Sequence, residues 1–222
     1  MAWLTNTKTG KPFNTDWLDE ENKKKYAQIE ENKRQANVLN NRYTPLYHGS
    51  DYKSMLEILT TNKLIAQASP KDVDGDVAVS FARSLNNAYG DVAVEVSRES
   101  LQNNYSLRPI RTYVDPDEER TSRTISDLSR HIKAIRWVDP TRTGVHLKFL
   151  RRQLVENFNN SQYTNTPGNN AYYIKQIASF ANERQIPIDS GMQKALSYIQ
   201  KFDNREFDTE RYNELKAKGR IK

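Results

Sequence analysis

The chain has 222 residues, of which 36% are hydrophobic, with a mean hydropathy of −0.89 and a formal net charge of +6. This length allows one domain with a substantial core plus helical additions, and the low hydropathy predicts that much of the chain is solvated. The absence of cysteine excludes disulfides, thiolate metal sites and cysteine nucleophiles, and the three histidines lack the spacing of a zinc helix, so catalysis has to use oxygen or nitrogen groups.

The basic residues are scattered, apart from one run at Lys23–Lys25 that glutamates follow closely. Such a run is more typical of a solvated helix face than of a nucleic-acid site, although the net charge favours weak attraction to nucleic acid or acidic proteins. No apolar segment approaches the roughly 18 to 20 residues that cross a bilayer, and the N-terminus lacks the hydrophobic region of a signal peptide. We expect a cytoplasmic protein without a membrane partner, or one packaged with such a protein.

Residues 1–40 are predicted to precede the main domain. Residues 1–14 mix polar residues with glycine, proline and two aromatics, which is typical of an extended arm. Asn14 or Thr15 can then cap a helix that has an acidic first turn and runs to about Asn37. The apolar positions of this helix are sparse, so it either packs against something else or stands in solvent. We interpret the arm and helix as a docking device for a protein partner.

The stretch at residues 44–50 reads Thr-Pro-Leu-Tyr-His-Gly-Ser and is predicted to be a strand that ends at a histidine. Pro45 suits the start of a strand, and Gly49 lets backbone approach a ligand closely. Binding and catalytic groups often occupy such strand-to-loop junctions. His48 is therefore a candidate ligand-binding residue, and the alternative is a half-buried histidine that caps a turn.

The following residues, as far as 140, alternate between short helices and short strands. Residues 67–76 form an acidic loop, and because no glutamate stands at the bidentate position, an ordinary loop is favoured over a calcium site. Pro109 predicts an edge or a bulge in its strand. We expect strands at 63–66 (or a turn), 77–80, 91–96, 105–113 and 134–138, and helices at 54–60 (capped by Ser50 or Asp51), 98–102 and from Ser126 or Asp127 to Ile132. This order predicts an α+β domain over residues 41–140 with a short, mostly antiparallel sheet.

Several segments in this domain resemble, in order, the motifs of ADP-ribosyltransferases. They are Leu46–Ser50, Val79–Arg83, Gly90–Val96, Asn104–Pro109 and Glu118–Arg120, followed by Ile125 and His131. The likeness is to the small ADP-ribosyltransferase-like domains that phages encode, some of them within virion polyproteins, and it covers about residues 43–138. The resemblance implies a split antiparallel sheet with flanking helices, and NAD as co-substrate.

The resemblance also implies roles for single residues. His48 would hold an adenosine-side ribose hydroxyl, and the backbone of Gly49 would meet the nicotinamide carboxamide. Ser80 would support the nicotinamide site and Phe81 would be available to stack on a ring. The remaining two candidates are Arg83, which would pair with a pyrophosphate oxygen or else with a neighbouring carboxylate, and Tyr89, which resembles a tyrosine placed over nicotinamide or else is a core aromatic.

The third motif implies a catalytic glutamate near the head of a sheet strand, which would stabilise the positive charge of the transition state. Asp117 and Glu119 have an acid-x-acid spacing, which on a strand points both carboxylates to one face. We therefore choose Glu119 as the catalytic candidate, with Glu118 second. Residues 121–124 are more polar than the hydrophobic strand expected there, so a catalytically inactive domain is an alternative.

Residues 141–222 resemble no family and are predicted to form an accessory helical region that selects or docks the target. Helices are expected at 145–158, 171–184, 190–202 and 209–218, with a plain loop at 159–170. Lys148, Arg151 and Arg152 lie among aromatics, so this face either touches nucleic acid or is merely solvated.

The resemblance implies a phage-encoded, NAD-dependent mono-ADP-ribosyltransferase that modifies a macromolecule, with protein favoured over nucleic acid as the acceptor. One alternative keeps the NAD chemistry but transfers to water or to an RNA phosphate. The other is an inactive structural or binding protein of a virion.

Overall fold

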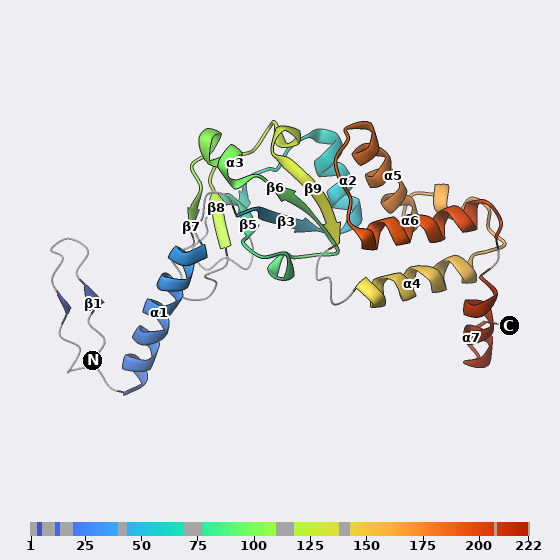
Figure 1. The fold of residues 1–222 in the computed structure, drawn as a ribbon, viewed down its shortest axis with the longest axis horizontal. Helices are drawn as coiled ribbons and strands as arrows, with labels where there is room; N and C mark the ends of the chain where they lie inside the picture. Colours follow the sequence, from blue (N-terminus) through green and yellow to red (C-terminus); the bar gives the residue numbers. More distant parts are fainter. Residues whose placement is uncertain are drawn as a thin grey trace.

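The computed structural model describes residues 4–5, 12–13, 20–39, 44–68, 77–109, 118–137, 143–206 and 208–221. Their fold is α+β, as predicted, with a seven-stranded sheet in which every described pairing is antiparallel (Figure 1). The sheet has the order β7-β8-β5-β3-β6-β9, and β4 pairs with β5. Its strands are β3 (Leu46–Ser50), β4 (Gln67–Ala68), β5 (Val77–Ala82), β6 (Val92–Val96), β7 (Arg108–Pro109), β8 (Glu118–Thr121) and β9 (Ile132–Trp137).

Helices flank this sheet at both ends of the molecule (Figure 1). Helix α1 extends from one end, and α4 to α7 gather at the other end, next to β9. The helices are α1 (Glu20–Leu39), α2 (Tyr52–Thr61), α3 (Arg98–Asn104), α4 (Thr143–Glu156), α5 (Asn170–Glu183), α6 (Ser190–Asp203) and α7 (Thr209–Ala217). The N-terminal arm contributes one short antiparallel pair, β1 (Leu4–Thr5) with β2 (Pro12–Phe13). The rest of the arm, including the expected cap at Asn14 or Thr15, lies outside the described residues.

Helix α2 shows how the sequence builds the main core. Asp51 caps it, because its Oδ1 accepts a hydrogen bond from the backbone N–H of Ser54 at 2.9 Å, and the helix ends at Asn62, whose φ of 59° is left-handed. The buried residues Tyr52, Met55 and Leu59 recur at helical spacing, so they form one apolar stripe. This stripe packs against β3 and β6 and covers one face of the sheet, which we call the core face.

Strand β6 is buried on both faces, although its alternating sequence is typical of a strand with one solvated face. Val92, Val94 and Val96 lie on the core face and are fully buried. Ala93 lies on the opposite face, where Ala88 and the ring of Tyr47 cover it. The loop after β5 therefore folds back over the second face of the sheet, which we call the outer face.

The C-terminal helices share the core of the sheet. Ile174 and Ile177 of α5 and Ile199 and Phe202 of α6 belong to the same buried cluster as α2 and the core-face valines, and α5 packs along α2. The helices expected at 171–184 and 190–202 are confirmed as α5 and α6, and Asp189 caps α6.

The segment before α6 joins the edge of the sheet. The backbone N–H of Ile135 donates to the carbonyl of Pro187 at 2.9 Å, and that of Asp189 donates to the carbonyl of Ile135 at 3.2 Å. The Asp189 carboxylate accepts a third bond, from the backbone N–H of Trp137 at 2.7 Å. Residues 187–189 thus cover the free edge of β9, and Ile188 in this segment forms a parallel bridge with Ile135.

Three expected elements differ in the structure. The strand or turn expected at 63–66 has only a bridge from Leu64 to Ile125, and β4 lies just after it, where a loop was expected. The helix expected from Ser126 or Asp127 to Ile132 is only a 3-10 turn at Leu128–Arg130, and Ile132 already belongs to β9, where it pairs with Val96. The Asp127 carboxylate does not cap this turn, because it accepts from the hydroxyl of Tyr105 instead. Here long-range pairing outweighs local helix signals.

The strand expected at 105–113 is described only as β7, which lies at the edge of the sheet, where Pro109 had predicted an edge. Helix α3 extends to Asn104, past its expected end at 102, and so reaches the residue before the expected start of that strand. Residues 110–117 and 69–76 lie outside the described residues, and with them Asp117 and the acidic loop that had been weighed as a calcium site.

Candidate functional site

The three strands that carry the motifs lie side by side. Strand β3, with His48 and Gly49, neighbours β5, with Ser80 and Phe81, and β5 neighbours β8, which begins at Glu118. The sequence separates these segments widely, so the sheet is what brings them together. Alternation along each strand then divides their side chains between the core face and the outer face.

Strands β3 and β5 hardly pair with each other. Their register contains one residue pair, Tyr47 with Ala82, whereas β3 pairs with β6 along all five of its residues. Beyond that pair the imidazole of His48 reaches across, and its Nδ1 lies 2.9 Å from the carbonyl oxygen of Ser80. A side chain thus replaces the backbone ladder at this point, and we call it the split between β3 and β5.

The surroundings of His48 determine its protonation state. Burial lowers the pKa of His48 below its ordinary value of 6.5, and the ring meets the edge of Phe81 with centroids 5.9 Å apart. The imidazole is therefore neutral near pH 7. Because a carbonyl oxygen can only accept, Nδ1 carries the proton and Nε2 is the acceptor nitrogen. This tautomer can accept a hydrogen bond from a hydroxyl group, which is the role that the resemblance implies for His48.

Glu119 lies on the core face, paired with Phe81, and its side chain is fully buried. Arg98, at the start of α3, binds both of its oxygens, with Nε 3.0 Å from Oε2 and Nη2 2.9 Å from Oε1. Arg83, just after β5, adds a bond from its Nε to Oε1 at 2.9 Å. Both arginines are buried as well. The structure therefore places Glu119, Phe81 and Arg83 inside the protein, where Arg83 pairs with a carboxylate.

Glu118 points the opposite way, to the outer face. It pairs with Ala82 across the ladder, and its side chain is 17% exposed. Its Oε1 accepts from the Nε of Arg120 at 2.8 Å, on the same face of the strand. Ser80 shares this face because it lies two residues before Ala82. Glu118 is thus the carboxylate of the pair that solvent and a ligand can reach.

Gly49 also faces outward and lies directly under the loop after β5. A Cβ added to Gly49 would lie 2.0 Å from the backbone oxygen of Tyr89. Next to it Gly90 has a φ of +96°, and Asp91 donates from its N–H to the carbonyl of Ser50 at 2.9 Å. The Tyr89 side chain itself is 80% exposed. The close approach at Gly49 is thus made by the loop that presents Tyr89.

The outer face therefore gathers three of the residues proposed from the sequence, with a fourth on the loop over it. Gly49, Ser80 and Glu118 lie on that face and Tyr89 lies on the loop. His48 pairs with Val94 and lies on the core face, from which its ring reaches the split. A row of cross-strand neighbours runs along this face from Glu95 through Tyr47 and Ala82 to Glu118.

Two parts of this arrangement were missed in the sequence. Arg98 was assigned only to a helical turn, although the alternation of Val92, Val94 and Val96 continues to position 98 and predicts an inward side chain. The second is the polar pair beside Tyr47, where Arg136 donates to Glu95. Burial, and then the neighbouring Glu95, raise the pKa of the Tyr47 hydroxyl.

The C-terminal basic residues are paired. Arg151 binds Asp208 through two nitrogens, at 2.8 and 3.0 Å, and Arg152 binds Glu156 at 2.8 Å. These pairs favour the solvated reading of this helix face over a nucleic-acid site, since two of its three cations already have carboxylate partners.

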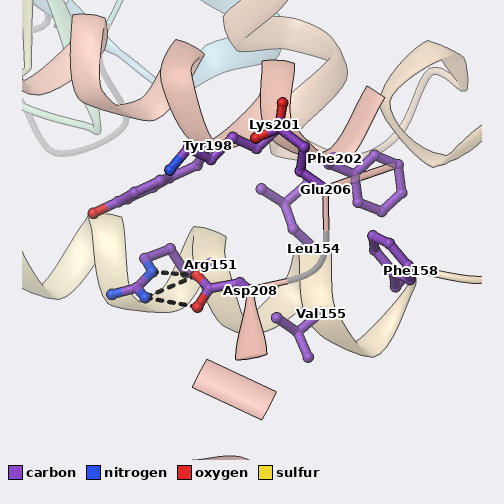
Figure 2. Close-up of a pocket in the computed structure, with 9 residues that line it drawn as sticks. All are labelled: Arg151, Leu154, Val155, Phe158, Tyr198, Lys201, Phe202, Glu206 and Asp208. Atoms are coloured by element: carbon purple, nitrogen blue, oxygen red, sulfur yellow. Dashed lines mark hydrogen bonds and ion pairs between the residues drawn. The ribbon is translucent and has the colours of Figure 1, made fainter. Parts of the chain in front are cut away.

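A pocket opens between α4, α6 and the start of α7 (Figure 2). Leu154, Val155, Phe158 and Phe202 line it, and the Arg151–Asp208 pair stands at its rim. Its free volume of about 30 Å³ suits one or two water molecules, whereas ligand pockets typically enclose roughly 300–1,000 Å³. This pocket is therefore too small for a dinucleotide.

Two searches of the described residues gave negative results. They contain no group of three or more histidine and acidic side chains that could hold a metal ion. No helix among them has both the length and the apolar character that a membrane span needs. Comparisons with family models, with curated proteins and with solved structures found no match for this chain.

Proposed function

We propose that this protein is an NAD-dependent mono-ADP-ribosyltransferase that acts on a macromolecule, and that its site is the outer face of β3, β5 and β8. The observation that carries the proposal is the convergence of Ser80 and Glu118 on one face, with the exposed Tyr89 on the loop over it and a neutral His48 at the split. His48, Ser80 and Glu118 come from three separated segments that resemble the family's motifs, and random segments would have no reason to meet in this way.

The chemistry needs a carboxylate near the bond that breaks. Departure of nicotinamide leaves positive charge on the ribose, and an ionised carboxylate stabilises that charge. We assign this role to Glu118, because Glu119 is enclosed by two arginines whereas Glu118 is partly exposed. Arg120 would orient Glu118 through the hydrogen bond from its Nε.

The other residues would hold the dinucleotide. Nε2 of His48, which reaches the split from the core face, would accept a hydrogen bond from a ribose hydroxyl, and Ser80 would offer its hydroxyl on the same side of β5 as Glu118. Tyr89, which is mostly exposed, would cover the nicotinamide ring. The split between β3 and β5 supports the finer assignment to an ADP-ribosyltransferase-like split sheet. With that assignment we propose a phage-encoded protein of the host cytoplasm or of the virion.

The test is the release of nicotinamide from NAD⁺ by the purified protein, with and without cell lysate. Glu118→Gln removes the proposed carboxylate charge, and Glu57→Gln, on the exposed side of α2, is the matched control. Release that requires lysate, persists in Glu57→Gln and collapses in Glu118→Gln supports a transferase. Release without lysate points to a glycohydrolase.

Two outcomes would refute the proposal. Full activity in Glu118→Gln would show that another group stabilises the transition state. If NAD⁺ is neither consumed nor bound in calorimetry, the enzymatic assignment fails, and an inactive virion protein becomes the better reading. If nicotinamide release requires lysate, labelled NAD⁺ would identify the acceptor by the mass that it adds to a protein or a nucleic acid.

A further inference from the structure

Strand β8 begins with two adjacent glutamates, and its sequence alone does not decide which one faces the site. Successive side chains on a strand point to opposite faces, so turning the strand over would exchange Glu118 and Glu119. The strand is only four residues long, and its outer neighbour β7 has two residues. The full ladder of β8 is with β5, along all four residues, and a shift by one residue against β5 would exchange the two glutamates and keep most of that ladder.

The side chains of β8 also give only a weak preference. Thr121 is fully buried on the core face and Arg120 lies on the outer face, so the segment reads acid, acid, base, hydroxyl from Glu118 onwards. No large apolar side chain anchors it to the core. The hydrophobic pattern that sets register in most half-buried strands is absent here.

On the core face, two buried guanidinium groups bind one carboxylate of β8. Arg83 and Arg98 bind Glu119 through three nitrogen atoms at 2.9 to 3.0 Å, from the end of β5 and the start of α3. A buried guanidinium is costly unless an anion meets it, so these arginines require a carboxylate on the core face at this position of β8.

We infer that Arg83 and Arg98 are positioning residues that hold Glu119 inward and thereby make Glu118 face the site. This inference rests on the proposed function for the role of Glu118, but the orientation itself can be measured without NAD⁺. Buried polar groups can fix register in this way, as a single buried polar residue does in coiled coils.

The natural absence of cysteine allows a direct readout of orientation. Three single-cysteine variants are needed: Glu118→Cys for the outer face, Thr121→Cys for the core face, and Met55→Cys on the buried side of α2 as a control for global unfolding. Each is made with the natural arginines and again with Arg98→Met, and the rate of maleimide labelling is followed under native conditions.

With both arginines present, we expect Glu118→Cys to react and Thr121→Cys to be protected. With Arg98→Met, the labelling rate of Thr121→Cys should rise by at least about tenfold while Met55→Cys stays protected. Arg98→Lys, which keeps the charge, should restore part of the protection. Thr121→Cys that stays protected in Arg98→Met would overturn the inference, and so would Met55→Cys opening together with it, because the arginine would then hold the whole fold.

The enzymatic readout separates the two proposals. If NAD⁺ is turned over, Arg98→Met should lower kcat for nicotinamide release with little change in KM, since the dinucleotide contacts remain. If the natural protein does not use NAD⁺, the proposed function fails while the labelling pattern still decides the role of the arginines.

Discussion

Replacing Gly49 by alanine tests the close contact between β3 and the loop that carries Tyr89. The new Cβ would lie 2.0 Å from the Tyr89 oxygen and 3.0 Å from its carbon and nitrogen, all of them backbone atoms. The loop has to retreat by about 1 Å, which strains the hydrogen bond from Asp91 to Ser50. Because no flexible side chain can yield instead, the substitution should destabilise the fold.

The magnitude follows from two opposing effects. Overpacking of a well-packed contact costs about 1–3 kcal/mol, and the smaller entropy of the unfolded alanine chain returns about 0.4–1 kcal/mol. We expect a net loss of about 1–2 kcal/mol in the free energy of unfolding, which for a chain of this size lowers Tm by roughly 2–8 °C.

Gly144 provides the matched control. It lies in the first turn of α4, and an added Cβ would meet nothing within 4 Å. The same substitution there should therefore stabilise the protein by about 0.5–1 kcal/mol through helix propensity. Urea unfolding followed by circular dichroism measures both variants. Equal signs for Gly49→Ala and Gly144→Ala would refute the reasoning, because the contact with the Tyr89 backbone is what should make the first substitution destabilising.

Three further predictions concern charged and capping groups. Glu119→Gln should lower the free energy of unfolding by about 3–5 kcal/mol, because it leaves buried arginine charge without its carboxylate, whereas Glu118→Gln should cost less than about 1 kcal/mol; similar urea midpoints would contradict this. The lowered pKa of His48 means that its neutral form stabilises the fold fully above about pH 6.5, and that this contribution is lost as the pH falls below that value. His48→Asn should therefore flatten the decline in stability between pH 7 and 5, and an unchanged slope would count against it. Asp208→Ala removes the carboxylate that accepts from the N–H of Arg211. Hydrogen exchange should show that the free energy of local opening of α7 falls by about 1 kcal/mol, and an unchanged value would show that the cap is unimportant.

Much of the fold could be predicted because local patterns and long-range packing agree. The Val92–Val96 run specifies a strand and the amphipathic spacing of α2 specifies a helix. The core is built from the buried side chains of that strand and that helix, so packing favours the same structures as the local patterns. The helix at 190–202 was predicted from its apolar period, and the structure has it there as α6, which Asp189 caps. At Ser126–Ile132 local signals favour a helix, but Ile132 pairs with Val96 in the sheet and only a 3-10 turn forms before it. No local pattern reveals this pairing.

The candidate site was less predictable, and the reason lies in the two-residue period of strands. Spacing could mark Glu118 and Glu119 as candidates, but choosing between them requires knowledge of which face Arg83 and Arg98 occupy. Those arginines lie 36 and 21 residues away along the chain. Gly49 was likewise expected to make room for a ligand, and only the fold shows that Tyr89 backbone fills this room.

The docking of residues 187–189 along β9 has a consequence for how the protein is made. Until Pro187 and Asp189 arrive, β9 presents free backbone groups at the edge of the sheet, and such an edge can pair with another chain. During synthesis from the N-terminus, the sheet strands leave the ribosome well before this segment does. The nascent chain therefore passes through an interval in which its sheet is complete in sequence but open at one side, and shielding by a chaperone would matter most in that interval.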